Sequence, residues 1–129
     1  MAGPGAGMSE ELVVQAEAVA LQAYAPYSRY LVGAVVVAVD GRKFSGVNVE
    51  NAAYPLGICA EKTALGAAAT AGVKPGEIAA IGITASPCGG CRQWLHEWQI
   101  PEVSFRRADG TIATWGAAEL LPDTWNLPE

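Results

Sequence analysis

Two short apolar stretches constrain the fold of this chain more than any other feature. Val32–Val39 is rich in valine, and Ile78–Thr84 is rich in isoleucine and alanine. Short apolar runs of this kind are typical of strands inside a sheet, and the second is predicted to be a central strand. Strands that alternate with helices need helices on both faces of the sheet.

Helical and strand patterns surround these two stretches. Apolar residues at helical spacing follow Ser9, the expected N-cap, and Pro26 bars the continuation of that first helix. Asp40-Gly41 is a hairpin signal. The other expected elements are strands over 43–49, 103–106 and 112–115 and helices over 59–71, 88–98 and 117–121. The order α-β-β-α-β-α-β-β-α predicts one α/β domain over residues 9–129, after a flexible tail over residues 1–8.

Composition excludes several classes of protein. Hydrophobic residues make up 51% of the chain and charged residues 16%, which excludes a disordered chain. The net charge is −5, and the eight Lys and Arg residues form no basic stripe, so a polynucleotide is not the expected partner. A small molecule is the expected ligand. So few charges also predict that a partner covers some apolar surface, most simply a second copy of the chain.

The same sequence predicts a cytoplasmic protein. Its first basic residue is Arg29, so the cationic region of a secretory or mitochondrial signal is missing. No apolar run approaches the length of a membrane span. Three cysteines are an odd number, which suits reduced thiols or metal ligation better than disulfides.

The spacing of the cysteines favours a metal site. Cys88 and Cys91 form a Cys-x-x-Cys pair at an expected helix start, and Cys59 opens another helix. Three unrelated buried thiols or a redox pair are the alternatives, although a redox pair needs no third cysteine. Three thiolates can bind Zn²⁺ and leave one coordination position for a water. His96 lies five residues after Cys91, which rotates its side chain about 140° away, so it is badly placed as a fourth ligand.

Glu61 supplies a carboxylate beside this expected site. It lies two residues after Cys59, in the first helical turn, where side chains lean toward the N-terminal end. A carboxylate there can sit beside a zinc-bound water without binding the metal. A glutamate that only interacts with the helix dipole is the alternative.

Four segments resemble the small cytidine deaminase family. They are Cys59-Ala60-Glu61, residues 86–93 (SPCGGCRQ), residues 48–58 (NVENAAYPLGI) and Pro26-Tyr27-Ser28. The similarity runs from about Ala23 to Trp125. It implies a three-layer α/β/α sandwich with a mixed five-stranded sheet, one zinc ion per chain and a homotetramer.

The resemblance also implies residue roles. Cys59, Cys88 and Cys91 are the implied zinc ligands, and Glu61 is the implied proton shuttle. The implied substrate contacts are the backbone N–H of Ala60, the sugar-binding Asn48 and Glu50, and the aromatic Tyr30, Tyr54 and Trp125, partly across subunit boundaries. Lys62, where the family commonly has arginine, and Arg92 are expected beside the metal site.

The implied reaction is hydrolytic deamination of free cytidine or deoxycytidine to uridine or deoxyuridine and ammonia, in pyrimidine salvage. A deaminase of a nucleoside-like antibiotic such as blasticidin S has the same zinc motifs and is the nearest alternative. A non-catalytic module with a structural zinc is another, and it requires a fourth protein ligand. The acidic net charge disfavours a polynucleotide-editing deaminase.

Overall fold

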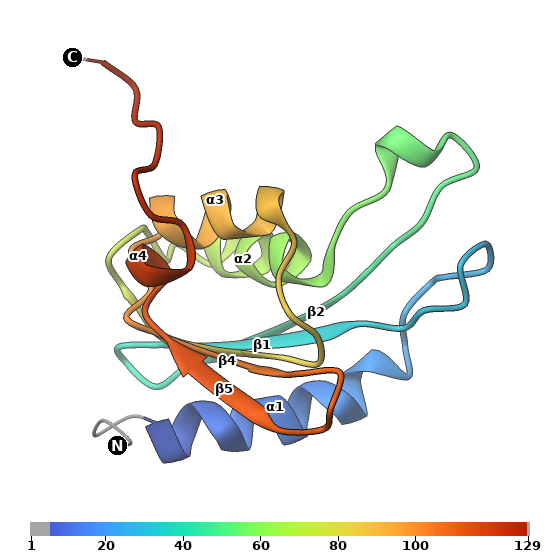
Figure 1. The fold of residues 1–129 in the computed structure, drawn as a ribbon, viewed down its shortest axis with the longest axis horizontal. Helices are drawn as coiled ribbons and strands as arrows, with labels where there is room; N and C mark the ends of the chain where they lie inside the picture. Colours follow the sequence, from blue (N-terminus) through green and yellow to red (C-terminus); the bar gives the residue numbers. More distant parts are fainter. Residues whose placement is uncertain (1–5, 129) are drawn as a thin grey trace.

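A mixed five-stranded sheet forms the middle layer of the protein (Figure 1). The computed structural model describes residues 6–128. Its strands are β1 (Gly33–Ala38), β2 (Lys43–Val47), β3 (Ile78–Ile83), β4 (Glu102–Arg106) and β5 (Ile112–Trp115), in the spatial order β2-β1-β3-β4-β5. All five predicted strands are therefore confirmed, with β3 in the centre as expected.

The strand directions make the sheet mixed. β1 is antiparallel to β2 and to β3, and β4 is antiparallel to β5. β3 and β4 are parallel, with Ile83 opposite Phe105 at their carboxyl ends. A parallel pair needs a crossover connection, and α3 (Gly89–Glu97) provides it. The carboxyl ends of β3 and β4 therefore meet at one edge of the sheet.

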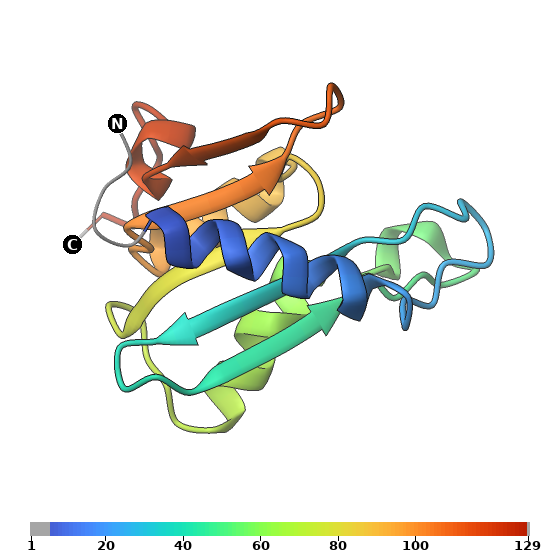
Figure 2. The ribbon, with the colours of Figure 1, turned by 90° about the horizontal axis from the view of Figure 1, so that it is seen from below.

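Helices cover both faces, as the alternating pattern predicts. α1 (Ala6–Ala20) crosses one face, and α2 (Ala60–Thr70), α3 and the short α4 (Ala117–Leu120) lie on the other (Figures 1 and 2). α1 can lie against the sheet because Gly82 has no side chain: a Cβ there would overlap the backbone of Leu12 and Val13. None of the described helices has the length and apolarity needed to cross a membrane.

Two apolar clusters hold the layers together. The larger lies between the sheet and α2, α3 and α4, and includes Leu65, Ile81, Leu95 and Val103, all with exposed fractions of 0%. The smaller lies beneath α1 and includes Leu12 and Ala16. Burial of a large aliphatic side chain stabilises a fold by about 1.5–3 kcal/mol, so the larger cluster is the main reason that α2 and α3 stay fixed on the sheet.

The start of α1 differs from the prediction. The helix begins at Ala6, so residues 6–8 of the expected tail are helical, and residues 1–5 lie outside the described part. Ser9 is not an N-cap but a fully buried residue inside α1, with its Oγ 2.7 Å from Oγ of Ser104 on β4. A buried hydroxyl needs a partner, and the sheet supplies it.

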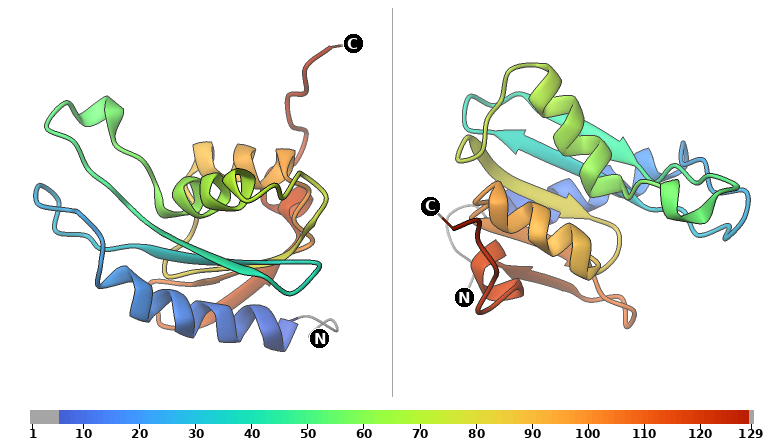
Figure 3. Two further views of the ribbon diagram at one scale, coloured as in Figure 1. Left: turned by 180° about the vertical axis from the view of Figure 1, so that it is seen from behind. Right: turned by 90° about the horizontal axis from the view of Figure 1, so that it is seen from above.

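Two segments project beyond the layers on the side where α1 ends (Figure 3). One connects α1 to β1, and the other connects β2 to α2 and contains a short 3₁₀ helix, Tyr54–Leu56. Backbone hydrogen bonds join their bases, from Tyr24 N to Asn48 O at 3.1 Å and from Glu50 N to Tyr24 O at 2.8 Å. The two projecting segments are therefore tied together where they leave the sheet.

Gly46 allows α2 to approach β2 closely, which gives a test of the fold. A Cβ at Gly46 would overlap backbone or side-chain atoms of Ala60, Thr63 and Ala64. We expect Gly46→Ala to lower the free energy of unfolding by about 1–3 kcal/mol, because the added methyl group overpacks this contact. Urea denaturation measures the change. The matched control is Gly66→Ala in α2, where an added Cβ meets nothing within 4 Å. This substitution should stabilise the helix by about 0.5–1 kcal/mol. Equal changes in the free energy of unfolding at both positions would contradict the prediction.

Candidate active site

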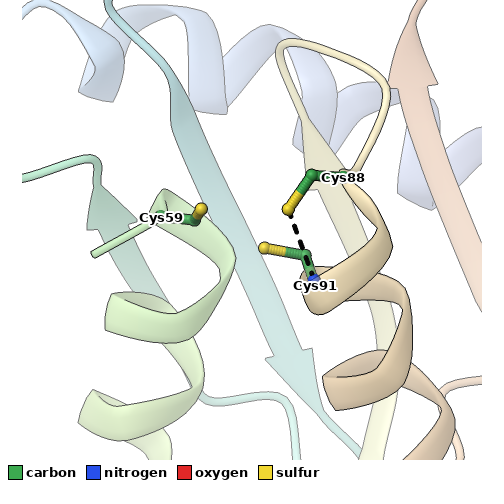
Figure 4. Close-up of side chains that lie close together, drawn as sticks. All are labelled: Cys59, Cys88 and Cys91. Carbon is green, nitrogen blue, oxygen red and sulfur yellow. Dashed lines mark hydrogen bonds between the residues drawn. The ribbon is translucent and has the colours of Figure 1, made fainter. Parts of the chain in front are cut away.

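The N-termini of α2 and α3 bring the three cysteines together (Figure 4). Cys59 is the N-cap of α2 and Cys88 is the N-cap of α3, while Cys91 lies in the first turn of α3. Their Sγ atoms all lie within 4.8 Å of one another. Tetrahedral zinc with bonds of about 2.3 Å spaces its sulfur ligands by about 3.8 Å, so small side-chain shifts bring three ligands onto one ion.

The surroundings of the thiols explain why a cation fits them. Burial raises the pKa of Cys59 and of Cys91 above the ordinary thiol range. Burial also raises the pKa of Cys88, but hydrogen bonds from the Cys91 N–H and from the other two thiols outweigh it, and the net shift is downward. Cys88 is therefore the thiol that ionises most readily. A divalent cation would stabilise all three thiolates in this small volume, since a coordinated thiol is deprotonated.

Glu61 is the buried carboxyl group of the site. Its exposed fraction is 4%, and it lies in the first turn of α2, directly after Ala60. Burial raises its pKa above the ordinary glutamate value, and a hydrogen bond with Cys91 and the charge of Lys62 oppose part of that rise. Because its pKa is raised, this carboxyl group holds a proton more readily than an exposed glutamate, which suits a group that accepts and releases protons in general acid–base chemistry.

A pocket of about 530 Å³ lies over these groups. Cys59, Cys88 and Glu61 line it, and so do four of the predicted substrate contacts: Tyr30, Asn48, Glu50 and Ala60. Further lining comes from Ser28 and Val32, from Thr84, Ala85 and Ser86 after β3, and from Arg106, Arg107 and Ala108 at the end of β4. The structure thus places two of the three expected metal ligands, Cys59 and Cys88, and four of the six expected substrate contacts around one cavity large enough for a small molecule.

Asn48 and Glu50 are held by the projecting segment between α1 and β1. Asn48 accepts a hydrogen bond from Val32 N at 2.9 Å and donates one to Tyr30 O at 2.9 Å. Glu50 accepts hydrogen bonds from the backbone N–H groups of Tyr27 and Ser28, at 3.0 and 3.1 Å, and from the Ser28 hydroxyl. These bonds, the Ser28 hydroxyl first, lower the pKa of Glu50, so the carboxylate stays ionised.

Ser28 is a site residue to which the sequence analysis assigned no role. It fixes the Glu50 carboxylate, lines the pocket and also accepts a hydrogen bond from Tyr30 N at 3.0 Å. Its motif, Pro26-Tyr27-Ser28, was visible in the sequence, but its partner is distant in the chain. Arg107 is a second such residue, and only its adjacency to another arginine could have drawn attention to it.

Lys62 and Arg92 both lie near the N-terminus of α3. Lys62 extends from α2 toward α3, with its Nζ 6.0 Å from the ring centroid of Trp94 and beside Gly90. Arg92 donates hydrogen bonds to Pro87 O at 2.9 Å, to Ser86 Oγ at 3.1 Å and to Leu120 O at 3.1 Å. Arg92 therefore holds the loop before Cys88 against α4, whereas Lys62 places a positive charge beside the first turn of α3.

Three residues lie away from the metal centre in the single chain. Tyr54 lines a second hollow next to the pocket, and its ring meets that of Tyr27 edge-on at 5.9 Å. Trp125, in the segment after α4, is 66% exposed and does not line the pocket. His96 lies 3.0 Å from Oδ1 of Asn126 and 3.1 Å from Oγ1 of Thr124, through its Nε2. Among residues 6–128 the candidate metal-ligand cluster consists of the three cysteines, and the His96 ring contacts the segment after α4 instead.

Comparison with known proteins agrees with this geometry. Residues 7–107 match the profile of the cytidine and deoxycytidylate deaminase zinc-binding region. A cytidine deaminase from Sporosarcina psychrophila is 36% identical over 91% of this chain and 90% of its own length. A crystal structure of a cytidine deaminase from Burkholderia pseudomallei is 44% identical, with a TM-score of 0.83 over 90% of this chain and 98% of that one. The cytidine deaminase of Mycobacterium tuberculosis is 34% identical, with a TM-score of 0.75 over 94% and 97% of the two chains.

These matches support a zinc site and the α/β/α fold. The zinc-binding profile spans all three converging cysteines, and together they assign one zinc ion to each chain. The expected α/β/α sandwich with a mixed five-stranded sheet is confirmed by the strand order and by the structural neighbours.

Proposed function

The chain is an enzyme of the cytidine deaminase family of hydrolases, and from this we propose that it removes the exocyclic amine of free cytidine and deoxycytidine in pyrimidine salvage. The products are uridine or deoxyuridine and ammonia. One observation carries the proposal: the buried Glu61 and two of the three convergent thiols, Cys59 and Cys88, line a pocket of about 530 Å³. A cavity of that size suits a nucleoside.

The residues around the pocket have complementary tasks in this reaction. Cys59, Cys88 and Cys91 would hold the zinc ion, which would supply an activated water as the nucleophile. Glu61 would accept a proton from the attacking water, deliver it to ring N3 and later assist the departure of ammonia. The N–H of Ala60, at the start of α2, donates to the pyrimidine. Glu61 suits its task because it is buried directly beside the thiols without belonging to their cluster.

The remaining hydrogen-bonding capacity of Asn48 and Glu50 supports a sugar site. A carboxylate accepts about four hydrogen bonds, and Tyr27 and Ser28 supply three to Glu50, so one position stays open. The Asn48 amide uses one donor and one acceptor within the chain and retains one of each. Both groups can therefore still bind hydroxyls.

Loss of these groups should affect ligands that carry a sugar. We expect Glu50→Ala to raise KM for cytidine by about 10-fold to 150-fold, the value of a hydrogen bond to a charged group, and Asn48→Ala by about 2-fold to 10-fold, because its amide is neutral. The rise for cytosine, which has no sugar, should be much smaller. Steady-state kinetics on both compounds checks this, with Glu77→Ala, after α2, as the charge control. If both variants bind cytidine normally, Asn48 and Glu50 do not bind the sugar.

Lys62 is proposed to balance the charge of the metal centre. Three thiolates and Zn²⁺ sum to −1, and the N-termini of α2 and α3 contribute about +0.5 each, which leaves no excess positive charge to favour hydroxide. We expect Lys62→Gln to speed the loss of zinc to a chelator, because its ammonium lies beside the first turn of α3. Lys62→Arg should retain zinc, and Lys74→Gln, at an exposed position after α2, is the charge control. If the Lys62→Gln and control variants lose zinc at the same rate, Lys62 does not contribute to zinc retention.

A homo-oligomer, proposed to be a tetramer, would cover the projecting segments. Their exposed apolar side chains are Tyr24, Tyr27, Tyr30, Leu31, Val49, Tyr54, Leu56 and Ile58. Clustered apolar exposure of this kind marks an interaction surface. Such an assembly would also bring Tyr54 and Trp125 to the pockets of neighbouring chains. Light scattering at micromolar concentration tests this, and an active monomer would contradict it.

One assay separates the proposed function from its rivals. Ammonia release is followed with cytidine, deoxycytidine, cytosine and blasticidin S as substrates of the zinc-loaded protein. Turnover of the two nucleosides supports the proposal, and turnover of blasticidin S alone supports an antibiotic deaminase. No turnover of any compound by the zinc-loaded protein would support a structural zinc module.

A further inference from the structure

The pocket wall opposite the proposed sugar site carries a positive charge that the deamination chemistry does not use. Arg107 follows β4 and lines the pocket. It also lines a second hollow of about 390 Å³, whose walls include Arg92, the exposed ring of Trp115 and Glu119, which in the described part of the chain accepts a hydrogen bond from Gly116 N and forms no ion pair with Arg107. The two hollows share Ser86, Arg107 and Ala108, so Arg107 lies in the wall between them.

The order of the strands decides which part of a substrate faces Arg107. Asn48 follows β2, whereas Thr84 follows β3 and Arg107 follows β4, so the pocket runs across the sheet from the proposed sugar site to Arg107. The parallel register ends with Ile83 opposite Phe105, so Thr84 and Arg107 both lie just past the carboxyl ends of this strand pair. In cytosine, C4 lies across the ring from the sugar-bearing N1, and C5 is next to C4. With its sugar at Asn48 and its N3 facing Glu61 and Ala60 on α2, as the proposed reaction requires, a bound cytidine turns its C5 edge away from α2 and toward the end of β4, where Arg107 lies.

The charge of Arg107 has little compensation. The neighbouring Arg106 pairs with Glu17 at 2.9 Å and donates to Gly110 O at 2.9 Å. Within residues 6–128, the guanidinium of Arg107 makes no ion pair or hydrogen bond. Asp109 is nearby, but hydrogen bonds from Thr111 are the main reason for its lowered pKa, and the charge of Arg107 contributes only a minor part. Arg107 is thus free to pair with an anion in the pocket.

We propose that Arg107 forms a subsite for an anionic substituent on C5 of the pyrimidine, so that the enzyme also deaminates 5-carboxycytidine. This inference rests on the proposed deamination of cytidine. Water supplies the oxygen of the new C4–O bond, the C4–N bond breaks and ammonia leaves. The carboxylate at C5 passes unchanged into the uridine product. The planar guanidinium matches a carboxylate with two parallel hydrogen bonds, which a neutral substituent of similar size cannot form.

The test compares 5-carboxycytidine with 5-methylcytidine, a neutral ligand substituted at the same carbon. The zinc-loaded wild-type enzyme is expected to have a higher kcat/KM for the carboxylate than for the methyl compound. Arg107→Gln should lower this ratio by at least about tenfold, the effect of losing a charge-assisted hydrogen bond. Arg107→Lys should give an intermediate ratio. The control is Arg42→Gln, which removes the same charge in the β1–β2 turn, outside the residues that line the pocket, and should keep the wild-type ratio.

Two outcomes overturn the subsite: a wild-type enzyme that does not prefer the carboxylate, or a ratio that Arg107→Gln leaves unchanged. Calorimetry of both ligands with wild-type and Arg107→Gln protein gives a measurement that does not depend on turnover. If cytidine itself releases no ammonia, the proposed function fails, and the dissociation constants still decide the subsite. Equal affinity of the wild-type protein for the two ligands, or the same affinity ratio in both proteins, then rejects it.

Discussion

Replacement of Glu61 by glutamine is expected to lower kcat for cytidine by at least about 100-fold, because a general acid–base group typically contributes 10²–10⁴ in rate. The amide has nearly the same shape as the carboxyl group, so it should fill the same buried space in the first turn of α2. Zinc content and nucleoside binding should therefore be retained. Stopped-time assays, metal analysis and calorimetry on the same preparation separate the three properties.

The control for this variant is Glu97→Gln at the exposed end of α3, which makes the same chemical change outside the residues that line the pocket. Its kcat should stay within about twofold of wild type, as surface changes away from a site usually have small effects. If kcat of Glu61→Gln falls by tenfold or less, Glu61 does not take part in the proton-transfer steps. A loss of zinc in that variant would instead assign Glu61 a role in holding the metal.

Loss of a single cysteine is expected to abolish metal binding and activity together. Cys88 is the most informative position because it is exposed, so its replacement leaves no core cavity. As the N-cap of α3, its Sγ accepts a hydrogen bond from Cys91 N at 3.5 Å. Serine is a preferred N-cap residue, so Cys88→Ser should preserve the helix while it removes a thiolate ligand. We expect zinc content to fall from one ion per chain to a small fraction and deamination to become undetectable.

Cys88→Ala and His96→Gln complete this experiment. Cys88→Ala removes both the cap and the ligand, and should cost about 1 kcal/mol of stability relative to Cys88→Ser. His96→Gln should keep its zinc, because His96 contacts Asn126 and Thr124 instead of the metal centre. Full activity in a zinc-free Cys88 variant would exclude the proposed metal chemistry. Zinc loss in His96→Gln would indicate a fourth protein ligand and a closed structural site.

Local patterns in the sequence predicted the secondary structure well. The apolar run Ile78–Thr84 became the central strand β3, and Asp40-Gly41 formed the turn between β1 and β2, with Gly41 at a φ of 93°. These features depend on neighbours in the chain. The start of α1 was predicted wrongly for the opposite reason. The polar side chain of Ser9 suited an N-cap, but it bonds instead to Ser104, which is 95 positions away.

The chemistry of the candidate metal centre was also determined by sequence alone, since ligand type and helix-start spacing are local properties. Cys59 and Cys88 occupy the N-cap positions of their helices, and Glu61 follows in the first turn of α2, as expected. Only the tertiary structure decided what surrounds that centre. Three features depend on strand order and register. They are the close approach of α2 to β2 at Gly46, the hydrogen bonds from Ser28 to Glu50, and the position of Arg107 in the pocket wall. These arise from packing and pairing between distant segments, and no local pattern of residues encodes which distant segment lies next to which.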